Sequence, residues 1–141
     1  MKAIIGGAYN GKRKYVEDLL KKQQISYELF EGYIPDKVNF VNNGYFVIYN
    51  FEQMVLNYIE LDEETIVDQL FQKIKALDTQ SNVICICTDF GRGIVPIDKK
   101  ERKVRDTCGR LYQKLFQESN SVIRIWYGIP QILKGDNNNG Y

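Results

Sequence analysis

The sequence predicts one three-layer α/β domain, residues 1–134, with a mostly parallel central sheet and helices on both faces. Residues 2–5 form a short apolar strand that runs into glycines and then into a helix. A second run, Val83 to Thr88, is uncharged and rich in β-branched residues, and a glycine turn and a long amphipathic segment follow it. The length of 141 residues is enough for a single core. The polar, asparagine-rich residues 135–141 are expected to be disordered.

The composition is that of an ordinary soluble globular protein, with 44% hydrophobic and 26% charged residues. The 19 basic and 18 acidic side chains leave a net charge of +1, which gives no overall attraction to nucleic acid or to membranes. No apolar run is long enough to cross a membrane, and the first residues are too few for a signal peptide. Three cysteines, Cys85, Cys87 and Cys108, are too few for a disulfide framework, so we expect core thiols in a reducing cytoplasm.

The first loop has the spacing of a phosphate-binding loop. Its residues are Gly6, Gly7, Ala8, Tyr9, Asn10, Gly11, Lys12 and Arg13. They match G-x-x-x-x-G-K between a strand and a helix that runs to about Lys22, where backbone N–H groups cradle phosphates and the lysine reaches the terminal ones. The hydroxyl residue that would complete the motif and ligate Mg²⁺ is Arg13 here. The alternative is a plain glycine turn before a solvated basic helix.

The middle of the chain alternates strands and helices. Residues 25–30 read as a strand, and residues 38–41 and 45–49 could form a hairpin, because Asn-Gly is a strong hairpin signal. A helix is expected after Phe51. Residues 62–77 predict an amphipathic helix with Asp62 at its N-cap and an apolar stripe at helical spacing, followed by a turn into the next strand.

The segment from Asn82 to Gln113 organises the second half. A turn over residues 89–93 and an extended stretch ending at Pro96 lead into a helix from Lys99 to about Ser119. Its expected buried stripe is Val104, Cys108, Leu111 and Leu115. A glycine inside a helix is unfavourable, so Gly109 indicates close approach of another backbone or a ligand. Residues 121–127 predict the last strand, which Gly-Ile-Pro closes.

Four charged residues of this segment are candidates for catalysis. They are Asp89, Arg102, Arg105 and Asp106. Asp89 ends a strand, where α/β sheets bind ligands, and could hold hydrated Mg²⁺ or accept a hydroxyl proton; it could equally accept backbone N–H bonds in the turn. The arginines could clamp phosphate oxygens, or Arg102 could simply pair with Asp106 on a solvated helix face. We favour the functional interpretation for Arg105 and Asp106, because the nearby glycine suggests a packed surface.

These motifs resemble a known family. The matching residues are Asp89-Phe90-Gly91-x-Gly93-Ile94-Val95-Pro96, then Arg102, Arg105-Asp106, Gly109 and Gln113. They are similar to the second signature of the adenosylcobinamide kinase/adenosylcobinamide-phosphate guanylyltransferase family of cobalamin biosynthesis, which has glutamate in place of Asp89. The first loop is similar to the family's Gly-Gly-Ala-x-x-Gly-Lys-Ser except at its last residue. The resemblance covers residues 2–20, 46–60 and 82–134.

The resemblance implies a RecA-like P-loop domain that binds ATP or GTP and assembles as a trimer. It implies a nucleotide-dependent kinase acting on adenosylcobinamide, with Lys12 on the β- and γ-phosphates. Magnesium is possible, but Arg13 replaces one usual ligand and Tyr49 stands where the family has a metal-associated glutamate, so we nominate no metal ligand. Glu52 could compensate, but we favour for it a role in capping or solvating the start of the helix. The chain has no histidine to accept a guanylyl group. Two functions stay open: a kinase that has lost guanylyl transfer, and a catalytically degenerate paralogue that binds a nucleotide or anion or acts in regulation.

Overall fold

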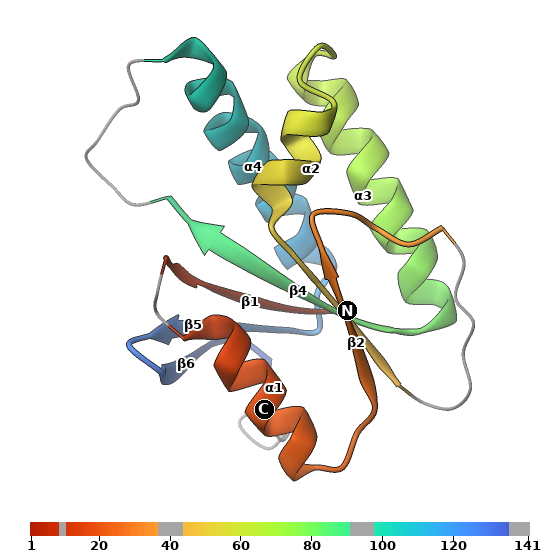
Figure 1. Cartoon of the computed structure of the whole chain (residues 1–141), viewed down its shortest axis with the longest axis vertical. Coiled ribbons are helices and arrows are strands. Elements are labelled where there is room, and N and C mark those ends of the chain that lie inside the picture. The colour runs from red at the N-terminus through yellow and green to blue at the C-terminus, as the bar shows by residue number, and fades with distance from the viewer. Residues whose placement is uncertain (9–10, 37–43, 91–97, 136–141) are drawn as a thin grey trace.

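The computed structural model describes residues 1–8, 11–36, 44–90 and 98–135, and Figure 1 shows how their elements are arranged. The strands are β1 (Lys2–Gly7), β2 (Tyr27–Glu31), β3 (Tyr45–Tyr49), β4 (Asn82–Asp89), β5 (Ser121–Trp126) and β6 (Ile129–Lys134). The helices are α1 (Lys12–Lys22), α2 (Phe51–Asn57), α3 (Glu63–Gln80) and α4 (Lys99–Glu118). None of these helices is long and apolar enough to span a membrane.

One six-stranded sheet runs through the molecule in the order β2-β3-β4-β1-β5-β6. Every pairing is parallel except that of β5 with β6, which is antiparallel. The prediction of an α/β fold with a mostly parallel sheet is therefore confirmed. β1 lies between β4 and β5. From β1 the chain crosses to β2 at one end of the sheet, and from β4 it crosses past β1 to β5 on the other side, so the direction of the connections reverses at this point. In open α/β sheets, ligands bind at the carboxyl edge of such a reversal.

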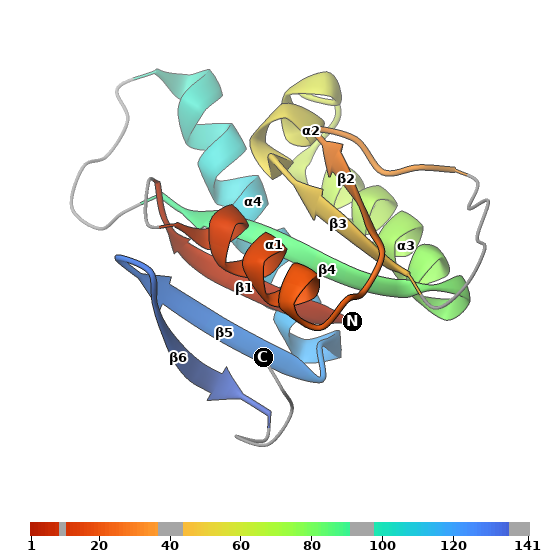
Figure 2. The ribbon, with the colours of Figure 1, turned by 60° about the horizontal axis from the view of Figure 1, so that its bottom comes forward.

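The two faces of the sheet are covered unequally (Figure 2). α1 lies on one face, where Val16 and Leu20 pack with Ile4, Ile84 and other strand residues. The helices α2, α3 and α4 lie on the opposite face over a larger apolar cluster. This larger cluster contains the predicted stripe of α4, and it also holds all three thiols, Cys85, Cys87 and Cys108. The cysteines are free and buried, as expected for small core side chains.

Three local predictions are wrong. Residues 45–49 were expected to pair in a hairpin, but β2 and β4 occupy the two edges of β3, so neither edge is left for residues 38–41, which themselves lie outside the described residues. The helix α3 runs to Gln80, where a turn was predicted, and ends at Ser81, whose hydroxyl donates a 2.8 Å hydrogen bond to the carbonyl oxygen of Leu77. The chain does not close at Gly128: a tight turn there brings β6 back along β5 as an exposed edge strand.

Gly109 is a fourth correction. A Cβ atom added to this glycine would meet nothing within 4 Å, and the residue is exposed on α4. No described backbone approaches it, so it does not mark a packed surface. The support that it gave to functional roles for Arg105 and Asp106 is therefore lost. The turn over residues 91–97, the loop residues Tyr9 and Asn10, and the tail after Gly135 lie outside the described residues.

Candidate functional site

The glycine loop, residues 6–13, begins at the carboxyl end of β1 beside the end of β4. Gly7, the last residue of β1, is the register partner of Asp89, the last residue of β4. Gly11 precedes α1 with φ 82°, a left-handed conformation that glycine adopts without strain. At Gly6 a Cβ atom would lie 2.5 Å from the carbonyl oxygen of Ile125, so only glycine fits there without a shift of β5. Backbone geometry therefore fixes both ends of the turn.

Lys12 is the first residue of α1 and points inward. Its side chain is only 8% exposed, and its Nζ donates a hydrogen bond of 2.7 Å to the carbonyl oxygen of Gly7. Burial lowers the pKa of Lys12, while the nearby Cys87, Glu52 and Asp89 act in the opposite direction. The same burial raises the pKa of Glu52 against the pull of Lys12. The structure thus brings Lys12, Glu52 and Asp89 into one electrostatic neighbourhood.

A hollow of about 390 Å³ opens at this point. We call it the loop-side hollow, and it is lined by Gly11, Lys12, Arg13, Lys14, Tyr49, Asn50, Glu52, Ile86 and Thr88. Its basic side chains come from the start of α1, and its opposite wall is the end of β3 and the start of α2. Asn50 caps α2, because its Oδ1 accepts a hydrogen bond of 3.4 Å from the backbone N–H of Gln53. Glu52, considered above as a capping residue, instead faces this hollow.

The Arg13 side chain lines the loop-side hollow and contacts Tyr49, another of its lining residues. Its guanidinium carbon lies 5.1 Å from the centroid of the Tyr49 ring, and its Nε donates a 3.1 Å hydrogen bond to Glu17. Glu17 also accepts a 3.0 Å hydrogen bond from the hydroxyl of Tyr27 on β2. An exposed cation–π contact contributes about 0.5–1 kcal/mol and an exposed helical ion pair about 0.3–0.5 kcal/mol. Together they orient Arg13 without locking it.

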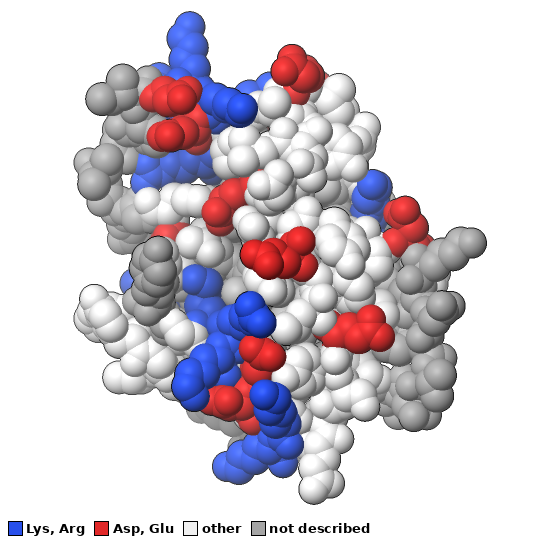
Figure 3. Space-filling model, viewed as in Figure 1, with Lys and Arg blue, Asp and Glu red and all other residues white. Residues whose placement is uncertain are grey.

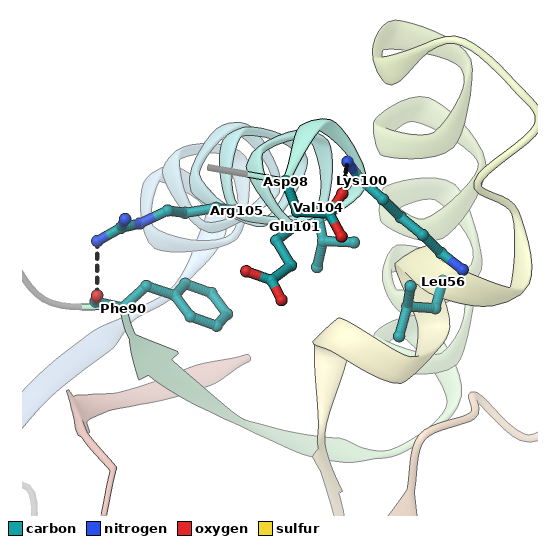
Figure 4. A pocket seen from close by; sticks show the side chains of 7 residues that line it. All are labelled: Leu56, Phe90, Asp98, Lys100, Glu101, Val104 and Arg105. Carbon is teal, nitrogen blue, oxygen red and sulfur yellow. Dashed lines mark hydrogen bonds between the residues drawn. The ribbon is translucent and has the colours of Figure 1, made fainter. Parts of the chain in front are cut away.

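A second hollow, of about 500 Å³, lies between α2, α4 and the end of β4 (Figure 4). We call it the helix-side hollow, and it is lined by Leu56, Phe90, Asp98, Lys100, Glu101, Val104 and Arg105. Arg105 lies at one side of it, and one of its Nη atoms donates a 2.6 Å hydrogen bond to the carbonyl oxygen of Phe90. Glu101 points from α4 toward the apolar floor. The hollow therefore combines an apolar base with charged side chains of both signs.

The four charged candidates are placed differently. Asp89 lies beside the glycine loop, and Arg105 lines the helix-side hollow. Arg102 and Asp106 are exposed side chains of α4 and line neither hollow. Glu101 also lines the helix-side hollow but was not predicted as a site residue. Its position four residues before Arg105 on the same helix, with Val104 between them, was the available signal.

Figure 3 shows basic side chains gathered over α1, with acidic side chains between them. Two of the pairs are salt bridges, Arg13 with Glu17 and Lys14 with Asp18. A third hollow of about 380 Å³ continues from the loop-side hollow, since it shares Gly11 and Lys14 and extends along α1 past Tyr15 to Gly128. An elongated anion with an aromatic end would find basic and apolar walls in that order.

Taken together, these features define an α/β protein with two hollows at the carboxyl edge of its parallel strands. The loop-side hollow is basic and lies at a glycine turn, and the helix-side hollow is partly apolar. The family model for cobinamide kinase / cobinamide phosphate guanyltransferase matches residues 39–133, well over half of the chain. The chain belongs to this family, as its motifs predicted. The match begins after the glycine loop, so the assignment of that loop depends on its own sequence and geometry. No curated protein matches the chain.

Proposed function

We propose that this chain binds a nucleoside triphosphate in the loop-side hollow and acts at the kinase step of cobinamide metabolism. Buried Lys12 is the observation that carries the proposal. A lysine costs free energy to bury as a cation, and among the described residues its ammonium has only the carbonyl oxygen of Gly7 as a hydrogen-bond partner. Phosphate oxygens would be better acceptors, and the adjacent turn offers backbone N–H groups and the positive end of α1.

The rest of the ligand follows from the neighbouring hollows. The nucleoside would extend along α1 toward Tyr15 and Gly128, in the third hollow. Cobinamide, which is large and partly apolar, would occupy the helix-side hollow between α2 and α4. Asp89 ends the strand between the two sites and would accept the proton of the attacking hydroxyl. We propose ATP or GTP as the nucleotide, and a P-loop fold of the RecA-like type for the domain.

Guanylyl transfer is not part of the proposal, because the chain contains no histidine to carry the guanylyl group. A second candidate is a nucleotide-binding or regulatory protein without turnover. The observation that favours it is Arg13, which stands where P-loop enzymes hold a hydroxyl ligand for magnesium. Magnesium, when bound, neutralises charge on the transferred phosphoryl group, so its loss would slow the reaction severely.

Calorimetric titration with ATP and with GTP, on the wild-type chain and on Lys12→Ala, tests the proposal. We expect one site with micromolar affinity, weakened about a hundredfold or more by the substitution, since the ammonium makes charge-assisted bonds. Equal binding by both chains would refute the loop assignment. Transfer of labelled γ-phosphate to adenosylcobinamide then separates the two candidates: product formation supports the kinase, and tight binding without product supports the binding protein.

A further inference from the structure

The donor set of the loop-side hollow does not suit a divalent cation. Mg²⁺ prefers oxygen ligands and is usually held by carboxylates, hydroxyls, water and the phosphates of the substrate. The lining residues include three cations, Lys12, Arg13 and Lys14, against a single carboxylate, Glu52. Their other oxygen donors are neutral, on Asn50, Thr88 and Tyr49, and Asp89, beside the glycine loop, is not among the lining residues. Burial disfavours the ionised form of that carboxylate by raising its pKa. Within the described parts of the chain, no group of three or more potential metal ligands from His, Cys, Asp and Glu occurs.

Arg13 occupies the place where the charge of the metal would be needed. It is the residue directly after the loop lysine, the position from which a hydroxyl reaches Mg²⁺ in P-loop proteins. Its guanidinium is held over the ring of Tyr49, on the wall of the hollow opposite the glycine turn. The ion pair with Glu17 uses Nε, which leaves the terminal nitrogens of the guanidinium for another acceptor. A guanidinium matches two phosphate oxygens at once.

We propose that Arg13, positioned by Tyr49 and Glu17, replaces the divalent cation, so that this chain binds the unchelated polyphosphate and not its magnesium complex. This inference depends on the proposed binding of a nucleoside triphosphate at the loop. The guanidinium neutralises the terminal phosphates from the side on which a metal would lie, while Lys12 and the backbone N–H groups at the start of α1 hold them from the other side. A bound Mg²⁺ ion would lie next to the positively charged guanidinium of Arg13 and would be repelled by it.

The test is calorimetric titration of ATP in excess EDTA and in excess Mg²⁺. The wild-type chain is expected to bind at least about tenfold more tightly in EDTA, because a charge-assisted bond to Arg13 is gained and a like-charge contact is avoided. In Arg13→Ser, which restores a hydroxyl, this preference should disappear or reverse. Wild-type binding that requires Mg²⁺ would overturn the inference and leave the proposed function intact. No binding of ATP by the wild-type chain in either buffer would overturn both.

Variants of the neighbours separate a specific role from a general loss of positive charge. Lys21→Ser removes one exposed cation from the last turn of the same helix, outside the lining of the loop-side hollow, and should keep the EDTA preference of the wild type. Tyr49→Phe keeps the ring beneath Arg13 and should also keep the preference for binding in EDTA. Tyr49→Leu removes the ring and should reduce the preference about threefold or more. If Lys21→Ser acts like Arg13→Ser, the inference is wrong, because total charge alone would then explain the result.

Discussion

The loop-side and helix-side hollows lie at the same edge of the sheet but are built in different ways. Backbone geometry and a buried cation shape the first: a left-handed glycine, a close approach of β1 to β5, and Lys12 at 8% exposure. Side chains of α2 and α4 around an apolar floor shape the second. The first hollow presents basic side chains and the second an apolar floor. This difference is the reason why we propose the triphosphate for the first hollow and cobinamide for the second.

Gly6→Ala should have the largest effect of the substitutions considered, and it acts on the loop-side hollow. The added Cβ would lie 2.5 Å from the backbone oxygen of Ile125, so β1 and β5 must move apart. We expect a loss of about 1–3 kcal/mol in the free energy of unfolding, measured by urea denaturation. Triphosphate binding should fall with it, because the loop starts at this strand. Unchanged stability would show that the close contact does not constrain the loop.

Arg105→Ala sharpens the comparison from the other side. The substitution removes the 2.6 Å hydrogen bond to the carbonyl oxygen of Phe90 and opens the helix-side hollow. Cobinamide affinity should fall roughly tenfold, and triphosphate affinity should stay within about twofold. Arg110→Ala is the matched control, because Arg110 pairs with Glu63 outside both hollows. Loss of triphosphate binding in Arg105→Ala alone would show that the two hollows form one site.

Gly109→Ala should have the opposite sign from Gly6→Ala. The new methyl group would meet nothing within 4 Å, and alanine favours a helix interior by about 0.5–1 kcal/mol over glycine. The melting temperature should therefore rise by a few degrees, roughly 2–4 °C, in a thermal scan. A destabilised variant would mean that something outside the described chain, such as a second copy, packs against this surface of α4.

The smallest expected effect is that of Glu52→Gln, and it depends on pH. Because burial raises the pKa of Glu52, the native chain keeps this proton to a higher pH than the unfolded chain does. The free energy of unfolding of the wild type therefore falls as pH rises from the usual carboxyl range through the native pKa. Glutamine does not ionise, so the variant should gain stability relative to the wild type as the pH rises from the usual carboxyl range through the native pKa of Glu52. A difference between the two that does not change with pH would contradict this assignment.

Much of the fold could be predicted from periodicity. The buried run of β4 and the i, i+4, i+7 stripe of α4 set those elements within one or two residues. The hairpin expected at residues 45–49 failed, because local turn chemistry does not reveal that other strands occupy both edges of β3. β6 was missed, since Gly128-Ile129-Pro130 was interpreted as the close of the last strand, although an edge strand tolerates proline.

For the candidate site, the glycine loop and Lys12 followed from spacing along the chain. The contact of Arg13 with Tyr49 could not be predicted from spacing, because it joins residues 36 positions apart through the placement of β3. The two positions that sequence reasoning treated as separate losses of metal ligands are in contact with each other. Of the residues that line the helix-side hollow, Arg105 was predicted as a site residue and Glu101 was not. The roles assigned to individual residues, and trimer formation, stay predictions.

The turn between β5 and β6 gives the protein a built-in optical probe. The only tryptophan of the sequence, Trp126, is 62% exposed there, and its ring lies 5.8 Å from that of Tyr127, next to the Gly128 that borders the third hollow. Its emission in the unliganded protein should be that of an indole in water. A purine ring that settles beside this turn would quench the signal or shift it to the blue, whereas inorganic tripolyphosphate would leave it unchanged. A cuvette measurement can thus locate the base without any label.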